Sequence, residues 1–460
     1  MRRVFLSGSL RNLYRMALAA LLLTASVAGA DDWPQWLGPR RDGVWRETGI
    51  IEQIPSNGLK VRWRTPVAQG YAGPAVADGR VYVIDFALPP GVAPEKDGFN
   101  PRRKSGKERV LCLDEKTGKV EWTHEYDCTY DIGYPGGPRA TPTVSGGKVY
   151  TLGAMGDLCC LDARKGTLLW SKNFMKDYGA PKQIWGFAAA PLVDGEKLIC
   201  LVGGPDSTAV AFHKDTGKEI WRSLKDGEHG YCPPVIIEAS GKRQLIIWTP
   251  AAVNSLDPES GKVYWSQPFR LKAGLSIPTP RQFGDLLLVS SFYNGSMMLK
   301  LDPDKPGAKV LWKSQVASEN PDRTDTLNSI IPTPYIKDGY IYGVCSYGEL
   351  RCLEAETGKR LWMTRQPTTG EALRWGNAFL IPNGDRFFLF NEKGELIIAK
   401  LTPKGYEEIS RTKVLEPTNA MATPRGRMVV WMHPAFANKC MYARNDKEIV
   451  CVSLAAEDYK

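Results

Sequence analysis

The sequence predicts an all-β fold, an eight-bladed β-propeller with four-stranded blades. One observation behind this prediction is a unit that recurs with a period in the high forties, with short apolar runs on either side of a turn. Another is the content of turn-forming residues, 45 Gly and 33 Pro among 460 residues. Hydrophobic residues at 43% and charged residues at 24% are typical of a globular chain, which excludes wholesale disorder.

Residues 1–30 have the features of a secretory signal peptide. The stretch from Arg2 to Arg15 is basic without acids, a mostly apolar run follows, and Ala28-Gly29-Ala30 is a small-residue cleavage site. The apolar run is shorter than the roughly 20 residues of a membrane-spanning helix. The first cysteine of the chain is Cys112, so no lipid-anchor cysteine follows the signal. We expect a periplasmic or secreted protein with no transmembrane span after signal removal.

A lead-in segment, residues 31–59, precedes the first predicted strand, Lys60 to Arg64. This strand comes before any set of three strands, whereas the last set, residues 422–454, has no fourth strand after it. We therefore expect the N-terminal strand to complete the last blade, which leaves no sheet edge open. The propeller then covers residues 60–460.

In each repeat, an alternating strand leads through an Asp and a Thr-Gly turn to a strand that ends in tryptophan. The clearest copy runs from Val110 to Trp122. The Asp side chain accepts hydrogen bonds from backbone N–H groups of the turn, and Gly adopts a positive φ without steric cost. We expect the indoles to dock between neighbouring blades. The docking residues are Trp63, Trp122, Trp170, Trp221, Trp265, Trp312 and Trp362, with Ile409 at the eighth position.

Strand direction alternates within a blade, so the turns divide between two faces. Short, uniform turns such as Asp338-Gly339 lie on one face. The links between blades lie on the other, together with the turns between second and third strands. This second face, the long-loop face, includes an insert at residues 87–109 in the first blade. Because variable loops on a rigid scaffold commonly carry function, we expect the ligand site there.

The candidate ligand residues of the long-loop face are aromatic, cationic or amide side chains. They are Tyr130, Tyr134, Arg139, Trp185, Tyr231, Arg323, Asn328, Arg374, Trp375 and Asn377. Trp185 and Trp375 occur in similar Trp-Gly settings, and they either plug the central channel or form a stacking platform for a flat ligand. Arg139 either faces the channel or bonds carbonyl groups between blades.

The repeated Leu-Asp-x-x-Thr-Gly-Lys-x-x-Trp unit resembles the tryptophan-docking motif of the pyrroloquinoline-quinone-like propeller repeat family. The resemblance covers residues 60–454. That family includes quinoprotein alcohol dehydrogenases, the propeller that helps assemble outer-membrane barrels, and exported propellers without an assigned role. The segment from Asp32 to Val44 is similar to the lead-in of this last group. The resemblance implies the propeller fold, and it does not by itself imply a function.

Catalytic motifs are absent from the sequence. It contains no nucleophile elbow, P-loop or dinucleotide fingerprint, and its 4 His leave little material for a zinc site, so no metal is expected. A quinoprotein dehydrogenase needs a quinone, a Ca²⁺ held by carboxylate and amide oxygens, and a carboxylate base. We cannot assign these Ca²⁺ ligands and this base to particular residues of the sequence. Cys159-Cys160 is similar to the vicinal disulfide of some quinoproteins, but successive side chains of a strand point to opposite faces, which favours two buried thiols.

Two cysteine pairs are candidates for disulfides. Cys345 and Cys352 flank a turn at Gly348-Glu349, and Cys440 and Cys451 flank one at Asn445-Asp446. Cross-strand neighbours lie within the Cα separation that a disulfide tolerates. The alternative is that all four thiols are free.

These observations predict a non-catalytic, monomeric binding or scaffolding module that uses its long-loop face. Its ligand is expected to be a protein, a small molecule or a glycan, and no cofactor is expected. The alternative is an oxidoreductase of the alcohol or sugar dehydrogenase type that carries pyrroloquinoline quinone (PQQ) with Ca²⁺. The net charge of +10 is modest and includes the signal-peptide arginines, so nucleic acid is excluded as a partner.

Overall fold

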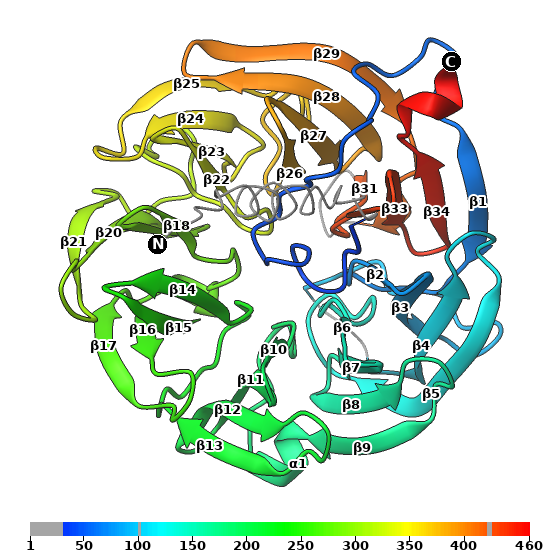
Figure 1. The fold of residues 1–460 in the computed structure, drawn as a ribbon, viewed down its shortest axis with the longest axis horizontal. Helices are drawn as coiled ribbons and strands as arrows, with labels where there is room; N and C mark the ends of the chain where they lie inside the picture. Colours follow the sequence, from blue (N-terminus) through cyan, green and yellow to red (C-terminus); the bar gives the residue numbers. More distant parts are fainter. Residues whose placement is uncertain (1–30, 100–102, 421–425) are drawn as a thin grey trace, which may run out of the picture.

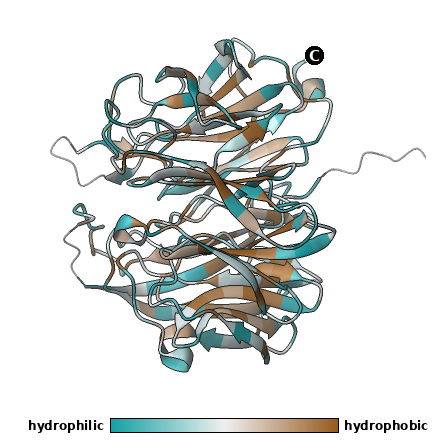
Figure 2. Ribbon diagram, turned by 90° about the vertical axis from the view of Figure 1, so that its left-hand side faces the viewer, coloured by the Kyte–Doolittle hydropathy of each residue, from teal (hydrophilic) through white to brown (hydrophobic). Residues whose placement is uncertain are grey.

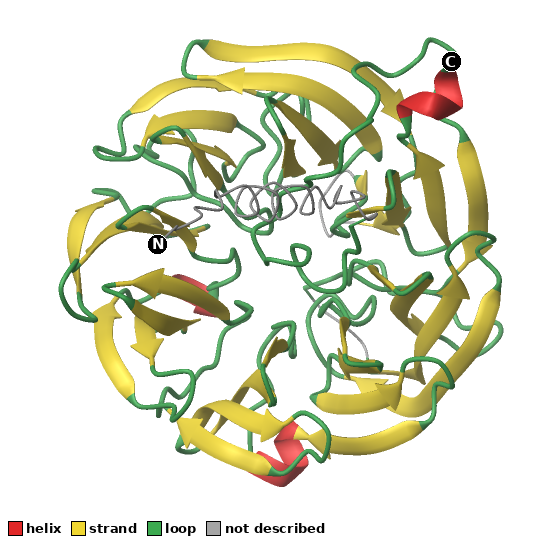
Figure 3. Ribbon diagram, viewed as in Figure 1, coloured by secondary structure: helices red, strands yellow, loops and turns green. Residues whose placement is uncertain are grey.

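The computed structural model describes residues 31–99, 103–420 and 426–460, and the predicted signal peptide lies outside them. The strands of these residues form eight antiparallel sheets of four strands and one small two-stranded sheet. The eight sheets are arranged as a ring, with the inner strand of each blade toward its centre (Figure 1). Strand and loop account for nearly all of the ring (Figure 3). The predicted eight-bladed β-propeller is confirmed.

The blades follow one another along the chain, each from its inner to its outer strand. Blades 1 to 4 comprise β2 (Ala75–Ala77), β3 (Arg80–Ala87), β4 (Lys104–Asp114) and β5 (Val120–Tyr130); β6 (Thr143–Ser145), β7 (Lys148–Leu152), β8 (Asp157–Asp162) and β9 (Leu168–Asn173); β10 (Leu192–Asp194), β11 (Lys197–Gly204), β12 (Ser207–His213) and β13 (Glu219–Ser223); and β14 (Val235–Ala239), β15 (Lys242–Trp248), β16 (Ala252–Leu256) and β17 (Val263–Pro268).

Blades 5 to 8 comprise β18 (Arg281–Phe283), β19 (Leu286–Ser291), β20 (Gly295–Leu301) and β21 (Ala308–Lys313); β22 (Tyr335–Lys337), β23 (Tyr340–Val344), β24 (Leu350–Glu354) and β25 (Arg360–Thr364); β26 (Ala378–Asn383), β27 (Arg386–Asn391), β28 (Glu395–Thr402) and β29 (Gly405–Lys413); and β32 (Ala435–Ala437), β33 (Cys440–Arg444), β34 (Glu448–Ser453) and β1 (Val61–Pro66). Within the described residues, helical turns are limited to α1 (Phe174–Tyr178), η1 (Lys272–Gly274) and η2 (Ala456–Tyr459). The small sheet is formed by β30 (Asn419–Ala420), which pairs with β31 (Met428–Val429).

The N-terminal strand closes the ring as predicted. β1 pairs with β34 antiparallel, with Trp63 opposite Cys451 and Thr65 opposite Ile449. The first strand of the chain is therefore the outer strand of the last blade. Hydrophobic residues recur along the strands of the ring (Figure 2), and buried apolar side chains of neighbouring blades pack into shared clusters.

Six of the seven predicted tryptophans join neighbouring blades by a hydrogen bond. The indole N–H of Trp63 donates to Glu115 O at 2.7 Å, and that of Trp122 donates to Ala163 O at 3.1 Å. The same bond is made by Trp170, Trp221, Trp312 and Trp362. Trp265 packs at the interface of blades 4 and 5, but its N–H donates to Gln244 Oε1 within its own blade.

The turn glycine explains why this docking repeats. A Cβ at Gly118, which has a φ of +69°, would lie 2.5 Å from the Trp63 ring, so only glycine allows the indole to lie flat on the turn. Gly307 in blade 5 has no such contact with Trp265. The Asp302 N–H donates to Gly307 O, whereas the Asp114 N–H donates to Lys119 O, so Gly307 occupies the position that follows the turn glycine.

The insert of the first blade is shorter than predicted. β3 and β4 remain paired as far as Ala87 and Lys107, and β4 begins at Lys104. Ala87 and residues 104–109 of the predicted insert are therefore strand, because β4 and β5 extend the blade with ladder hydrogen bonds that the sequence does not reveal.

Neither predicted disulfide is present, and all ten cysteines are free and buried. Cys352 lies opposite Tyr342, while Cys345 lies beyond the end of β23, so their register does not allow a bond. Cys440 lies opposite Ser453 rather than Cys451. The Cys440 and Cys451 thiols interact instead, which lowers the pKa of Cys440 and raises that of Cys451.

Candidate functional site

The lead-in segment, residues 31–59, lies across the centre of the ring on the side of the short turns. It crosses the middle of the ring in Figure 1, where it forms the dark blue trace. Trp33 exchanges backbone hydrogen bonds with Val76 of blade 1, and the Trp45 N–H donates to Pro382 O of blade 7. Both indoles are almost fully buried. The lead-in therefore forms a floor across the centre of the ring.

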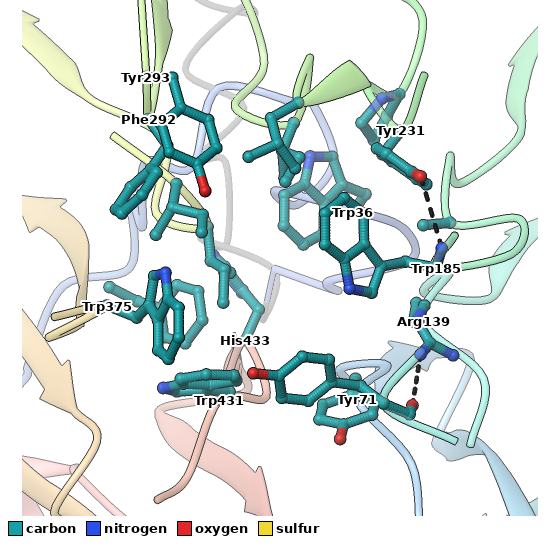
Figure 4. Close-up of a pocket in the computed structure, with 18 of the residues that line it drawn as sticks. Trp36, Tyr71, Arg139, Trp185, Tyr231, Phe292, Tyr293, Trp375, Trp431 and His433 are labelled. Atoms are coloured by element: carbon teal, nitrogen blue, oxygen red, sulfur yellow. Dashed lines mark hydrogen bonds between the residues drawn. The ribbon is translucent and has the colours of Figure 1, made fainter. Parts of the chain in front are cut away.

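A cavity of about 210 Å³ lies above this floor, where the links between blades converge. Each of the eight links contributes at least one large apolar side chain to it. These are Tyr71, Tyr134, Trp185, Tyr231, Leu275, Ile330, Trp375 and Trp431. Phe292 and Tyr293, from the turn between the second and third strands of blade 5, complete the wall (Figure 4). We call this cavity the aromatic cup.

Trp36 and His433 form the base of the aromatic cup. The Trp36 indole N–H donates to Thr279 Oγ1 at 2.9 Å, and its ring centroid lies 5.0 Å from that of His433. His433 Nδ1 lies 2.6 Å from Pro434 O, so this nitrogen carries the hydrogen. Burial lowers the pKa of His433 to about 4, so the ring is neutral at pH 7 and Nε2 is a hydrogen-bond acceptor.

The wall of the aromatic cup is poor in polar groups. Its described lining residues include no Asp, Glu, Asn or Gln. Arg139 is the cation of the wall, and its guanidinium donates to Gly137 O at 2.7 Å and to Gly133 O at 2.8 Å. The same group lies 5.1 Å above the Tyr71 ring. Arg139 thus lines the cup and also bonds backbone carbonyls of its own link.

Five of the ten predicted ligand residues line the aromatic cup: Tyr134, Arg139, Trp185, Tyr231 and Trp375. Arg374 lies beside it, with its guanidinium 4.7 Å from the Trp375 ring centroid and 2.9 Å from Glu319 Oε1.

The other predicted residues have different surroundings. Asn328 is buried and donates to Phe292 O and Ser318 O, which fixes the loop behind the wall. Asn377 is 1% exposed and its side chain is outside the lining. Arg323 is exposed on its link, and the Tyr130 hydroxyl donates to Glu108 inside blade 1.

The sequence analysis missed several residues that line the cup: Trp36, Tyr71, Phe99, Phe292, Tyr293, Trp431 and His433. A signal for some of them exists, because Tyr71 and Trp431 each lie three residues before the proline that opens an inner strand. Aligning that position across the eight links would have revealed it. Trp36 gives no such signal, since the lead-in lies outside the repeats.

Two clusters of the described residues have the ligand types for a metal ion. One is Glu108, Cys128 and Asp157. Glu108 accepts hydrogen bonds from the Tyr126 and Tyr130 hydroxyls and from Ala154 N at 2.9 Å, so its oxygens already have partners. The other is the surface group Glu196, His213 and Asp215, where Lys148 lies 2.9 Å from Asp215 Oδ1. Neither cluster contacts the aromatic cup.

Comparison with known proteins identifies relatives of this propeller. The family model described as outer membrane protein assembly factor BamB matches residues 106–318 and 251–459. The chain belongs to this family. BamB from Burkholderia pseudomallei is 24% identical over 244 residues, which is 51% of this chain and 57% of that protein. A quinoprotein ethanol dehydrogenase from Pseudomonas putida is 30% identical over 165 residues, 31% of this chain and 26% of that protein.

Solved structures confirm the fold. BamB from Moraxella catarrhalis superposes with a TM-score of 0.56 at 15% identity, covering 86% of this chain and 99% of that one. Quinohemoprotein alcohol dehydrogenase from Comamonas testosteroni gives 0.58 at 14% identity, covering 92% and 80%. The sequence matches span less than two thirds of the BamB relatives, 57% and 64% of the first two. None of the described helices is long or apolar enough to cross a membrane.

PQQ with Ca²⁺ does not fit the aromatic cup. The described lining offers no carboxylate or amide oxygen for the ion, and the guanidinium of Arg139 donates to backbone carbonyls. Cys159 and Cys160 of β8 belong to different apolar clusters and do not line the cup. The described lining of the aromatic cup therefore lacks the donor set that the quinoprotein alternative requires.

Proposed function

We propose that this protein is an exported, non-catalytic binding and scaffolding module whose long-loop face receives an apolar ligand in the aromatic cup. The observation that carries the proposal is the composition of the wall, to which all eight links contribute aromatic or aliphatic side chains. Burial of apolar surface is the main driving force available to such a site. Its membership of the BamB family supports a role in binding rather than catalysis.

The proposal predicts saturable binding of a small aromatic probe. We expect 4-methylphenol to bind in a calorimetric titration with a stoichiometry of one, since its ring matches the wall and its hydroxyl can donate to His433 Nε2. Ala188→Phe fills the cup from its own wall and should abolish binding. Ile220→Phe adds a ring to an exposed site on β13 and serves as the control. No binding to the parent protein, or equal binding to both variants, would reject the aromatic cup as a ligand site.

A further inference from the structure

The size of the aromatic cup limits what it can hold. At about 210 Å³ it is smaller than the 300–1,000 Å³ of most small-molecule pockets. It has room for one large side chain. The wall has no carboxylate or amide among its described residues, so it lacks the paired polar groups that recognise a sugar.

The rim of the cup is also apolar. Ile184 and Phe99, at 60% and 57%, are the most exposed large apolar side chains among the described residues. The Phe99 ring lies 5.3 Å from that of Tyr134 and 5.6 Å from that of Trp375. Ile184 precedes Trp185, and its carbonyl accepts from Gly133 N at 2.6 Å, which places it beside Tyr134. Phe99 also lines the cup, whereas Ile184 does not, so a ligand enclosed in the cup would leave Ile184 in water.

Polar groups lie next to this apolar rim. The partly buried Arg374 guanidinium is 2.9 Å from Glu319 Oε1 and 3.3 Å from the Tyr293 hydroxyl. An extended backbone that crosses the mouth carries N–H and C=O groups that need such partners. Deep apolar anchors surrounded by weaker contacts are typical of protein–protein interfaces.

Resting on the proposed function, we propose that the ligand of the aromatic cup is an extended polypeptide. One aromatic side chain of this polypeptide enters the cup, and the residues on either side of it lie across Ile184 and Phe99. Its backbone lies near Arg374 and Glu319. The rim thus distinguishes a polypeptide from a free aromatic molecule of the same ring size.

Calorimetry with three probes tests this inference. They are the capped peptide acetyl-Gly-Val-Tyr-Val-Gly-amide, its Tyr→Ala counterpart, and 4-methylphenol, which is the tyrosine side chain alone. We expect the tyrosine peptide to bind about tenfold more tightly than 4-methylphenol, and the alanine peptide to show no saturable binding. Ile184→Ser should weaken the peptide several-fold without changing the affinity for 4-methylphenol, because Ile184 is outside the lining of the cup.

Met363→Ser is the matched control, since it removes a comparably exposed apolar side chain from the outer strand β25. It should leave both affinities unchanged. A tyrosine peptide that binds no more tightly than 4-methylphenol, or an Ile184→Ser variant that weakens both probes equally, overturns the polypeptide inference and leaves the proposed function standing. If 4-methylphenol itself does not bind the parent protein, the proposed function fails as well.

Discussion

Tyr134 and Trp375 have backbone φ angles of +52° and +65°, a region that bulky residues rarely adopt. Both side chains line the aromatic cup, and both contact Phe99. Backbone strain persists where the surrounding structure enforces it, and it is concentrated at functional sites. The strain at these two positions is therefore consistent with selection for the direction of the two rings.

Trp375 allows this strain to be measured. Trp375→Ala and Trp375→Gly both remove the ring, but only glycine relieves the positive φ. We expect the glycine variant to be more stable than the alanine variant by about 1 kcal/mol in urea denaturation. Both should lose 4-methylphenol binding. A glycine variant as unstable as the alanine variant would show that the backbone at Trp375 carries no strain.

The docking tryptophans give a second comparison at this scale. Trp122→Ala removes the stack on Gly166 and the hydrogen bond to Ala163 O. Trp265→Ala removes packing but no bond to the next blade. We expect a loss of about 3 kcal/mol or more in the free energy of unfolding for Trp122→Ala and a smaller loss for Trp265→Ala. Equal losses would mean that the inter-blade bond adds nothing measurable.

His229 makes stability depend on pH. Its ring stacks on Phe187 at a centroid separation of 4.7 Å, and burial lowers its pKa from 6.5 to about 4. The unfolded chain binds the proton first as pH falls, so stability is lost between about pH 6.5 and pH 4, by about 3 kcal/mol for this residue. His229→Gln should reduce the pH dependence of the unfolding free energy over that window. An unchanged dependence would show that His229 is not buried as described.

At the scale of elements, the repeat unit predicted most of the blade structure. Asp114 accepts from the Thr117 N–H and hydroxyl, as expected for the Asp and Thr-Gly turn. The sequence could not predict where β4 begins and where β5 ends. The residues paired there, such as Ser105 opposite Thr129, are mostly polar and alternate between exposed and half-buried. Symmetric spacing about a turn could not predict cysteine pairing either. Tyr442 lies opposite Cys451, and Cys440 is two residues away from that position.

Ring closure by β1 can be separated from closure of the floor by the lead-in. Deleting residues 31–66 removes both, whereas deleting residues 31–59 keeps β1. We expect the shorter deletion to lose stability but still unfold in one transition, because β1 still pairs with β34. The longer deletion should lose cooperative unfolding by circular dichroism. Equal stability of the two truncated proteins would contradict closure by β1.

At the scale of the whole molecule, the aromatic cup could be predicted only in part. Trp185 and Trp375 stood out because each precedes a glycine in a similar setting. Tyr71 and Trp431 are far apart in sequence and meet only because the first and last links adjoin after ring closure. The position of Trp36 depends on a segment that belongs to no blade. A repeated position before the inner-strand proline marks Tyr71 and Trp431 in their links, but no local pattern indicates that they meet each other or Trp36.

The whole ring also predicts the outcome of a redox assay. We expect the purified protein, incubated with PQQ and Ca²⁺, to give no alcohol-dependent dye reduction, because the described cup residues supply no carboxylate for the ion or for a base. A parallel titration with 4-methylphenol shows that the cup is intact in the same preparation. Alcohol-dependent reduction that Ala188→Phe abolishes would establish the quinoprotein alternative.

The lead-in segment makes the two faces of the ring different, because it covers one face and leaves the mouth of the cup on the other. Residue Asp32 accepts from the Asp78 N–H at a short turn, so the described chain begins on the side opposite the mouth of the cup. A support that holds the protein by this end would present the mouth outward, and a ligand would approach without meeting the tether. Fixing the protein through Ile184 instead would cover the mouth. The side of the ring on which the lead-in begins therefore decides which face an immobilised protein presents to any ligand.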